Sequence, residues 1–131
     1  MPVPIEPGLE ATADRVVTED DTASAFGSGD VDVYATPALV ALCESAAVAA
    51  VADALDPKDT TVGTNITVDH LAPTQPGRNV TARARLERVD GRTLHFTVDA
   101  SDPSGPIARG THTRVIVDRE RFLRGAADRS T

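Results

Sequence analysis

Aromatic side chains and lysines are scarce in this chain of 131 residues. Aromatic residues make up 3% of the sequence, Trp is absent, and Lys58 is the only lysine. Few side chains are therefore available to stack on bases. The formal net charge of −7 also argues against sequence-independent binding to nucleic acid, which depends on many cations. We expect no nucleic-acid partner, and a core built from Val, Ala, Leu and Ile.

Cysteine is nearly absent too, because Cys43 is the only one. An intrachain disulfide is excluded, and a reducing compartment fits. The first fifteen residues lack the charged start and apolar stretch of a secretory signal. The apolar segment 37–52 is too short, too rich in alanine and too acidic at its centre to span a membrane. These features predict a cytoplasmic protein without a membrane partner.

The length and a hydrophobic content of 40% predict one soluble domain over residues 1–131. The proline-rich residues 1–8 are expected to form a flexible arm, and residues 126–131 a flexible tail.

One helix carries the most informative residue of the chain. Segment 37–52 reads PALVALCESAAVAAVA and holds a single carboxylate, Glu44. A helix that is apolar on every side is expected to be buried, and a buried carboxylate is costly unless it is paired or serves chemistry. The helix should begin at Thr36-Pro37 and run to about Leu55, before Pro57. From the helix alone, catalytic and structural roles for Glu44 remain equally open.

The other segments alternate with a period of two, as strands do. Strands are expected at residues 9–18, 61–71, 79–89, 93–100 and 107–117, and a short helix at 119–125. In the second strand, Val62, Thr64, Ile66, Val68 and His70 are expected on one face. Asp90-Gly91 predicts a hairpin.

One strand, one long helix and a four-stranded antiparallel meander predict an α+β hot-dog fold. In this fold, a sheet of about five strands wraps a single helix. A sheet of this size leaves an edge and an apolar flank open, so we expect a homodimer or a dimer of dimers.

Several motifs together resemble the fluoroacetyl-CoA thioesterase family of hot-dog proteins: VYATPALVALCESAAVAAV, VGTNITVDHLAPTQPG, VDGRTLHFTVDASD and GTHTRVIVDRERF. The resemblance covers about residues 30–124. It implies a catalytic set of Thr36, Glu44 and His70, with Gly63 at the thioester carbonyl. We place Thr64 and Arg114 beside Gly63 as substrate-binding residues.

The implied activity is hydrolysis of a small acyl-CoA thioester to the free acid and coenzyme A, without a cofactor or a metal. His70 would act as general base and later acid, and Glu44 would orient it or activate water. Thr36 would be the nucleophile or a hydroxyl relay, and the Gly63 amide a donor to the carbonyl. Eight helical residues separate Thr36 from Glu44 by about 12 Å. This spacing favours a site shared between two subunits.

Each of these residues also has a structural interpretation. Thr36 is suited to capping the helix, His70 to a core position, His112 to a structural or pocket-lining role, and Cys43 to a small buried thiol. A noncatalytic acyl-CoA or small-ligand binding protein and a hot-dog hydratase or dehydratase are the alternative functions. The fluoroacetyl-specific pattern has a lid aromatic a few residues before the helix, where this chain has Gly29-Asp30-Val31-Asp32. Candidate partners for the coenzyme A phosphates are Arg83, Arg85, Arg88, Arg92, Arg119 and Arg121.

Overall fold

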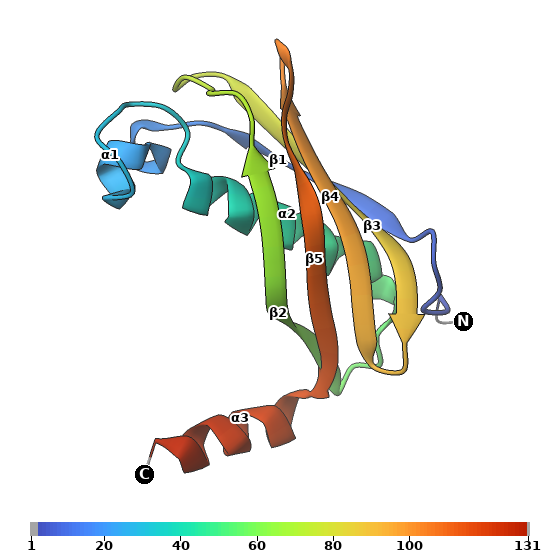
Figure 1. Ribbon diagram of the computed structural model, residues 1–131. Coiled ribbons are helices and arrows are strands. Elements are labelled where there is room, and N and C mark those ends of the chain that lie inside the picture. Colours follow the sequence, from blue (N-terminus) through green and yellow to red (C-terminus); the bar gives the residue numbers. More distant parts are fainter. Residues whose placement is uncertain (1–2, 131) are drawn as a thin grey trace.

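A five-stranded antiparallel sheet curls around one long helix in the computed structural model, which describes residues 3–130 (Figure 1). The strands are β1 (Glu10–Val16), β2 (Asp59–His70), β3 (Asn79–Asp90), β4 (Thr93–Asp102) and β5 (Gly105–Asp118). The helices are α1 (Ala23–Phe26), α2 (Thr36–Val51) and α3 (Arg119–Arg129), with short 3-10 turns at Glu19–Asp21 and Ala52–Ala54. All five predicted strands and the terminal helix are confirmed.

The strands follow the order β1-β3-β4-β5-β2 across the sheet. The prediction of a four-stranded meander was therefore wrong for β2, which pairs with β5 rather than with β3. Residues 71–78 connect β2, at one edge of the sheet, to β3, which lies beside the other edge strand, β1. As a result β2 is an edge strand with one side unpaired, and β1 forms the other edge.

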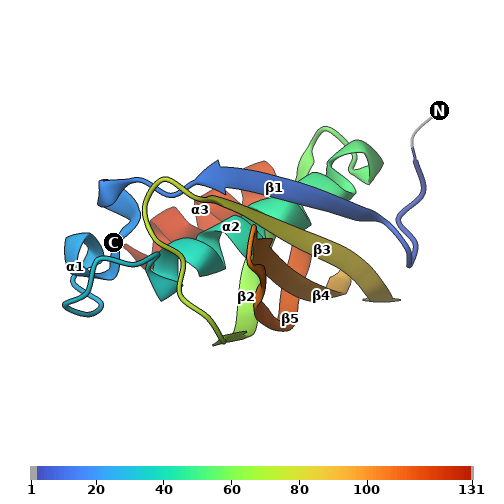
Figure 2. The ribbon, with the colours of Figure 1, turned by 90° about the horizontal axis from the view of Figure 1, so that it is seen from above.

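The core lies between the concave face of the sheet and α2, which packs mainly against β1 and β3 (Figure 2). Alternating residues of β3 and β4 face the core and are buried: Val80, Ala82, Ala84, Leu86, Leu94, Phe96 and Val98. The predicted hairpin is also present. Gly91 adopts a positive φ of 60° at the turn between β3 and β4, a conformation that favours glycine.

Helix α2 buries one side and leaves another open. Leu39, Cys43 and Ala47 are fully buried, whereas Ala41 and Val48 are exposed. The expectation that the helix is buried on every side was therefore wrong. With the following 3-10 turn, the helix reaches 19 residues, and by length and composition alone it could cross a membrane. Its packing inside the curl of the sheet is that of a core helix.

Strand β2 contains a bulge that changes which residues face the helix. The pairing with β5 shifts between Gly63 and Asn65, so Thr64 is an extra residue. Gly63 pairs with Arg114 and therefore shares its face, which puts Val62 on the opposite face. The prediction that Val62 lies on the same face as Ile66 and His70 was wrong because a strict alternation does not allow for this bulge.

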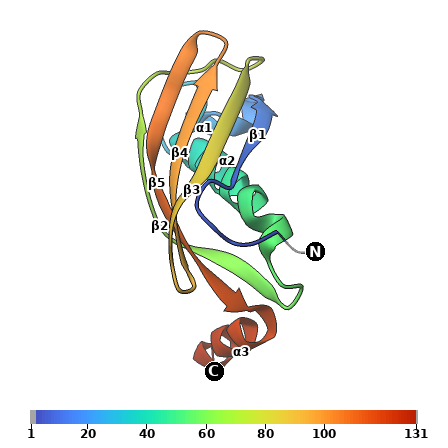
Figure 3. The same cartoon turned by 90° about the vertical axis from the view of Figure 1, so that its right-hand side faces the viewer.

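Two short segments complete the chain. Helix α1 ends at Phe26, and the next residue, Gly27, has a left-handed φ of 72°. Helix α3 continues through residues 126–129, which we had assigned to the tail, and none of its residues is buried. It projects from the end of the sheet, beyond the β2 and β5 ends (Figure 3).

Candidate active site

The hydroxyl of Thr36 and the imidazole of His70 form a hydrogen-bonded pair. Thr36 Oγ1 lies 2.8 Å from His70 Nδ1. Thr36 is the first residue of α2, and His70 is the last residue of β2. Residue Ala35, rather than Thr36, holds the N-cap position, and it makes no side-chain capping bond. The structural interpretation of Thr36 as a helix cap was therefore wrong, and its hydroxyl is directed to His70.

Burial lowers the pKa of His70, because the charged imidazolium loses contact with water. Its second ring nitrogen, Nε2, is buried and has no hydrogen-bond partner among residues 3–130. A lowered pKa keeps the ring neutral at neutral pH, the state that a general base needs.

A pocket of about 330 Å³ opens beside the Thr36–His70 pair. Its walls come from the loop before α2 and from residues 71–73, with Val31, Val33 and Leu71 among the apolar lining residues. Val31 occupies the stretch in which the fluoroacetyl-specific pattern has an aromatic residue, and it is 55% exposed. A short aliphatic group would fit the size and character of this pocket.

A second cluster surrounds Glu44 in the middle of α2. Arg114 Nη1 lies 3.2 Å from Glu44 Oε2, and His112 Nε2 lies 3.8 Å from the same oxygen. The Glu44 side chain is 39% exposed, while the Arg114 side chain is 7% exposed. Glu44 is therefore a paired carboxylate with one side open, instead of an isolated buried acid.

The buried side chains behind Glu44 are fully hydrogen-bonded to each other. Arg114 donates through Nε to Thr61 Oγ1 at 2.9 Å and through Nη2 to the Thr61 carbonyl at 3.0 Å. Arg114 Nη1 also lies 3.1 Å from His112 Nε2. Because a guanidinium can only donate, Nε2 accepts, and Nδ1–H of His112 donates to the Asn65 carbonyl at 2.7 Å. Burial lowers the pKa of His112, consistent with this neutral form.

Gly63 lies against this cluster with no room for a side chain. A Cβ at Gly63 would lie 2.7 Å from Glu44 Oε2 and 3.2 Å from both Arg114 Nη1 and His112 Cε1. Thr64, the bulge residue, is exposed and donates from its hydroxyl to the Thr113 carbonyl at 3.3 Å. The predicted neighbours Gly63, Glu44 and Arg114 thus do lie together, while Thr64 is turned toward β5.

The sequence-predicted residues form two groups instead of one. No hydrogen bond or ion pair in residues 3–130 joins the Thr36–His70 pair to the Glu44 cluster. Eight residues along α2 separate Thr36 from Glu44 by about 12 Å, and seven residues along β2 separate Gly63 from His70 by about 23 Å. Both groups lie along α2, which has one exposed side, and the edge strand β2.

His112 is the residue to which sequence analysis gave least weight, although it contacts both members of the Glu44–Arg114 pair. The signal was its two-residue spacing from Arg114 on one strand, which places both side chains on one face. Cys43 is fully buried, and burial raises the pKa of its thiol to about 11. A thiol with such a pKa is a poor nucleophile, so the interpretation as a buried thiol agrees with the structure.

A sheet curled around one long helix defines the hot-dog class of proteins, and the predicted fold is confirmed by solved structures. A Thermus thermophilus protein of the thioesterase superfamily matches with a TM-score of 0.86 and 30% identity, over 96% of each chain. A variant of the fluoroacetyl-CoA thioesterase FlK, solved in complex with acetyl-CoA, matches with a TM-score of 0.91 and 33% identity. That match covers 97% of this chain and 100% of the other.

Residues 17–120 match the family described as fluoroacetyl-CoA-specific thioesterase, and the chain belongs to this family. The fluoroacetyl-CoA thioesterase of Streptantibioticus cattleyicolor is 43% identical over 91 residues. Those residues are 70% of this chain and 66% of that relative, so the aligned region spans just under two thirds of the relative's length.

Proposed function

We propose that this protein hydrolyses the thioester of a short-chain acyl-CoA to the free acid and coenzyme A. The observation that carries the proposal is the 2.8 Å contact between Thr36 Oγ1 and His70 Nδ1 beside an apolar pocket. Family membership supports the same reaction, and a family relative has been solved with acetyl-CoA bound. The chain as a whole, residues 1–131, acts as one domain in this proposal.

In the proposed reaction, His70 takes the proton of the Thr36 hydroxyl as the oxygen approaches the thioester carbon. The C–S bond then breaks, and His70 returns the proton to the departing thiolate of coenzyme A. The Gly63 amide is the donor to the developing oxyanion, while Arg114, whose guanidinium is engaged by Thr61, His112 and Glu44, holds the Glu44 carboxylate in place. The acyl group is then an ester of Thr36. Glu44 takes a proton from water as the water oxygen attacks the ester carbon, the C–O bond to Thr36 breaks, and this proton returns to the Thr36 oxygen as the acid leaves. Thr64 lines the path of the substrate beside Gly63.

The proposed enzyme is a homodimer, or a dimer of dimers, with each site shared between two subunits. The edge of β2 is unpaired, and the open side of α2 exposes Ala41, Val48 and Ala49. A free edge beside an apolar stripe is well suited to a second copy of the chain. Such a copy would bring its Thr36–His70 pair to the Glu44 cluster of the first. The single reduced thiol, Cys43, supports a cytoplasmic location.

Thiol release from a panel of short, branched and aromatic acyl-CoA thioesters tests the proposal. We expect turnover with short acyl groups, and its loss in His70→Ala at unchanged fold. Tight binding of acyl-CoA without turnover of any panel member would overturn the proposal in favour of a binding protein. Light scattering at micromolar concentration tests the assembly, and a monomer mass would contradict it.

A further inference from the structure

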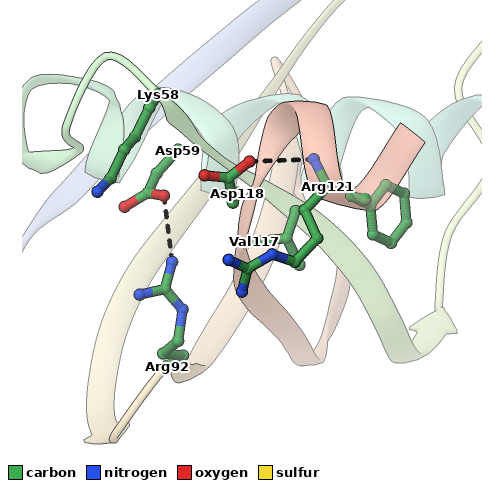
Figure 4. Close-up of a pocket in the computed structure, with 7 residues that line it drawn as sticks. Lys58, Asp59, Arg92, Val117, Asp118 and Arg121 are labelled. Atoms are coloured by element: carbon green, nitrogen blue, oxygen red, sulfur yellow. Dashed lines mark hydrogen bonds and ion pairs between the residues drawn. The ribbon is translucent and has the colours of Figure 1, made fainter. Parts of the chain in front are cut away.

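A second pocket has a volume of about 500 Å³ (Figure 4). Its lining residue Asp59 begins β2, and His70 ends the same strand. The pocket is formed where the start of β2, the β3–β4 hairpin, the end of β5 and the first turns of α3 meet. Its charged and aromatic lining residues are Lys58, Asp59, Arg92, Asp118, Arg121 and Phe122.

The pocket carries a surplus of positive charge on a protein of net charge −7. Asp59 is engaged by Arg92, whose Nη2 lies 3.2 Å from Oδ1. Asp118 caps α3 by accepting the backbone N–H of Arg121 at 3.0 Å. Both carboxylates therefore have partners, while neither Lys58 nor Arg121 has a carboxylate oxygen within 4 Å of its side-chain nitrogens in residues 3–130.

Two hydrogen bonds outside the hydrophobic core hold the walls of the pocket together. The backbone N–H of Arg119 donates to the carbonyl of Lys58 at 2.9 Å, which ties the first turn of α3 to the start of β2. Arg92 Nε donates to the carbonyl of Ile116 at 2.9 Å. Since α3 buries none of its own residues, core packing does not explain its position.

The pocket is connected to the candidate active site through β2. Four residues separate Asp59 from Gly63, a distance of about 13 Å along an extended strand. This distance is within the extended length of a phosphopantetheine arm. Phe122, which is 44% exposed, adds an aromatic surface to the cations. Cations bind phosphates, and an aromatic ring offers a stacking surface to a base.

We propose that this pocket binds the phosphorylated nucleotide end of coenzyme A, with Lys58 and Arg121 contacting the phosphates and Phe122 contacting the adenine. The inference rests on the proposed function for the choice of coenzyme A as the nucleotide. It assigns a role to α3 and to the one lysine of the chain.

Kinetics with a matched pair of substrates tests the pocket. The first substrate is an acyl-CoA that the protein hydrolyses, and the second is the same acyl group on pantetheine, which lacks the nucleotide. The double variant Lys58→Glu, Arg121→Glu should raise KM for the acyl-CoA about tenfold or more, and leave kcat/KM for the acyl-pantetheine within about twofold. Arg129→Glu reverses a charge on the same helix outside the pocket and should change neither. An equal loss with both substrates, or an equal effect of Arg129→Glu, would overturn the proposal.

A binding measurement tests the pocket without turnover. Reductive methylation with ¹³C-formaldehyde labels Lys58 and keeps its charge, and Lys58→Arg identifies its NMR signal by removing it. Titration with coenzyme A should shift this signal saturably, while pantetheine at equal concentration should leave it unchanged. No shift with coenzyme A, or an equal shift with pantetheine, would overturn the proposal. If the wild-type protein hydrolyses neither thioester, the proposed function fails, and this titration still decides whether the pocket binds the nucleotide.

Discussion

Thr36 Oγ1 and His70 Nδ1 lie 2.8 Å apart although 34 positions separate the two residues in the chain. The contact joins the first residue of the central helix to the last residue of an edge strand. Because Ala35 holds the N-cap position, the Thr36 hydroxyl does not cap the helix. The Thr36 hydroxyl is placed where the His70 imidazole can take its proton.

Thr36→Val should abolish most turnover and leave the fold intact. Valine keeps the shape of threonine but removes the hydroxyl, so kcat/KM should fall by at least about 10²-fold, as expected for lost acid–base chemistry. The loss of one hydrogen bond costs about 1 kcal/mol of stability. Thr36→Ser should retain activity, and Thr12→Val, at an exposed position of β1, is the matched control. Steady-state kinetics and thermal unfolding check both effects, and an active Thr36→Val enzyme would remove the hydroxyl from the mechanism.

The acid limb of the pH–rate profile should report His70. Burial lowers the pKa of His70, so the neutral base persists below the ordinary value of about 6.5. As pH falls, kcat/KM should decline with a midpoint below about 6.5, where His70 takes up its proton. Protonation of a group with a depressed pKa also opposes folding, so stability should decrease in the same direction. An activity midpoint above 6.5, measured where circular dichroism shows an intact fold, would contradict this assignment.

Glu44→Gln should reduce turnover more than it reduces stability. The change removes the charge that faces Arg114, whose side chain is 7% exposed. Glu44 is 39% exposed, so solvent screens the pair, and we expect a loss of about 1 kcal/mol in the free energy of unfolding. Hydrolysis should fall by about 10²-fold or more because the proposed base for water is gone. Glu10→Gln, which removes the exposed partner of Arg85, is the control. A destabilised variant whose folded fraction turns over normally would make Glu44 a structural residue.

The central helix could be predicted from its apolar segment between Thr36-Pro37 and Pro57. The five strands and the inward-facing residues of β3 and β4 could be predicted from a local alternation of period 2. The strand that pairs with β2 could not be predicted. Pairing with β5 instead of β3 depends on the path that residues 71–78 take around the helix. The bulge at Thr64 could not be predicted either, since an extra residue leaves no clear mark on an alternating sequence.

The same limits apply to the site. The resemblance to the thioesterase family implied Thr36, Glu44 and His70 as a set, and helix geometry predicted that Thr36 and Glu44 are far apart. The sequence did not predict the contacts among Glu44, His112 and Arg114, because these contacts depend on the register of β5 against β2. The helix sequence also could not show whether the Glu44 carboxylate has a partner, because that partner, Arg114, lies 70 residues away in the chain.

Gly63→Ala should impair catalysis through Glu44. The added methyl would lie 2.7 Å from Glu44 Oε2, so the carboxylate must move away from its position beside Arg114. Because that oxygen is at the end of a flexible side chain, the fold should tolerate the change. Gly125→Ala is the matched control, since a Cβ there meets nothing within 4 Å, and alanine favours the helix. We expect kcat to fall by about tenfold or more in Gly63→Ala and to be unchanged in Gly125→Ala. Equal activity of the two variants would show that the position of Glu44 is unimportant.

Complementation between two inactive variants tests the shared site most directly. In a heterodimer of Thr36→Val and Glu44→Gln subunits, one of the two shared sites carries both substitutions and the other carries neither. Verified heterodimers, isolated through two different affinity tags, should therefore recover about half of the wild-type thiol release per dimer, while each homodimer stays inactive. If Thr36 and Glu44 of one subunit formed the site, every site in the heterodimer would carry one substitution. Heterodimers as inactive as the parent variants would contradict the account.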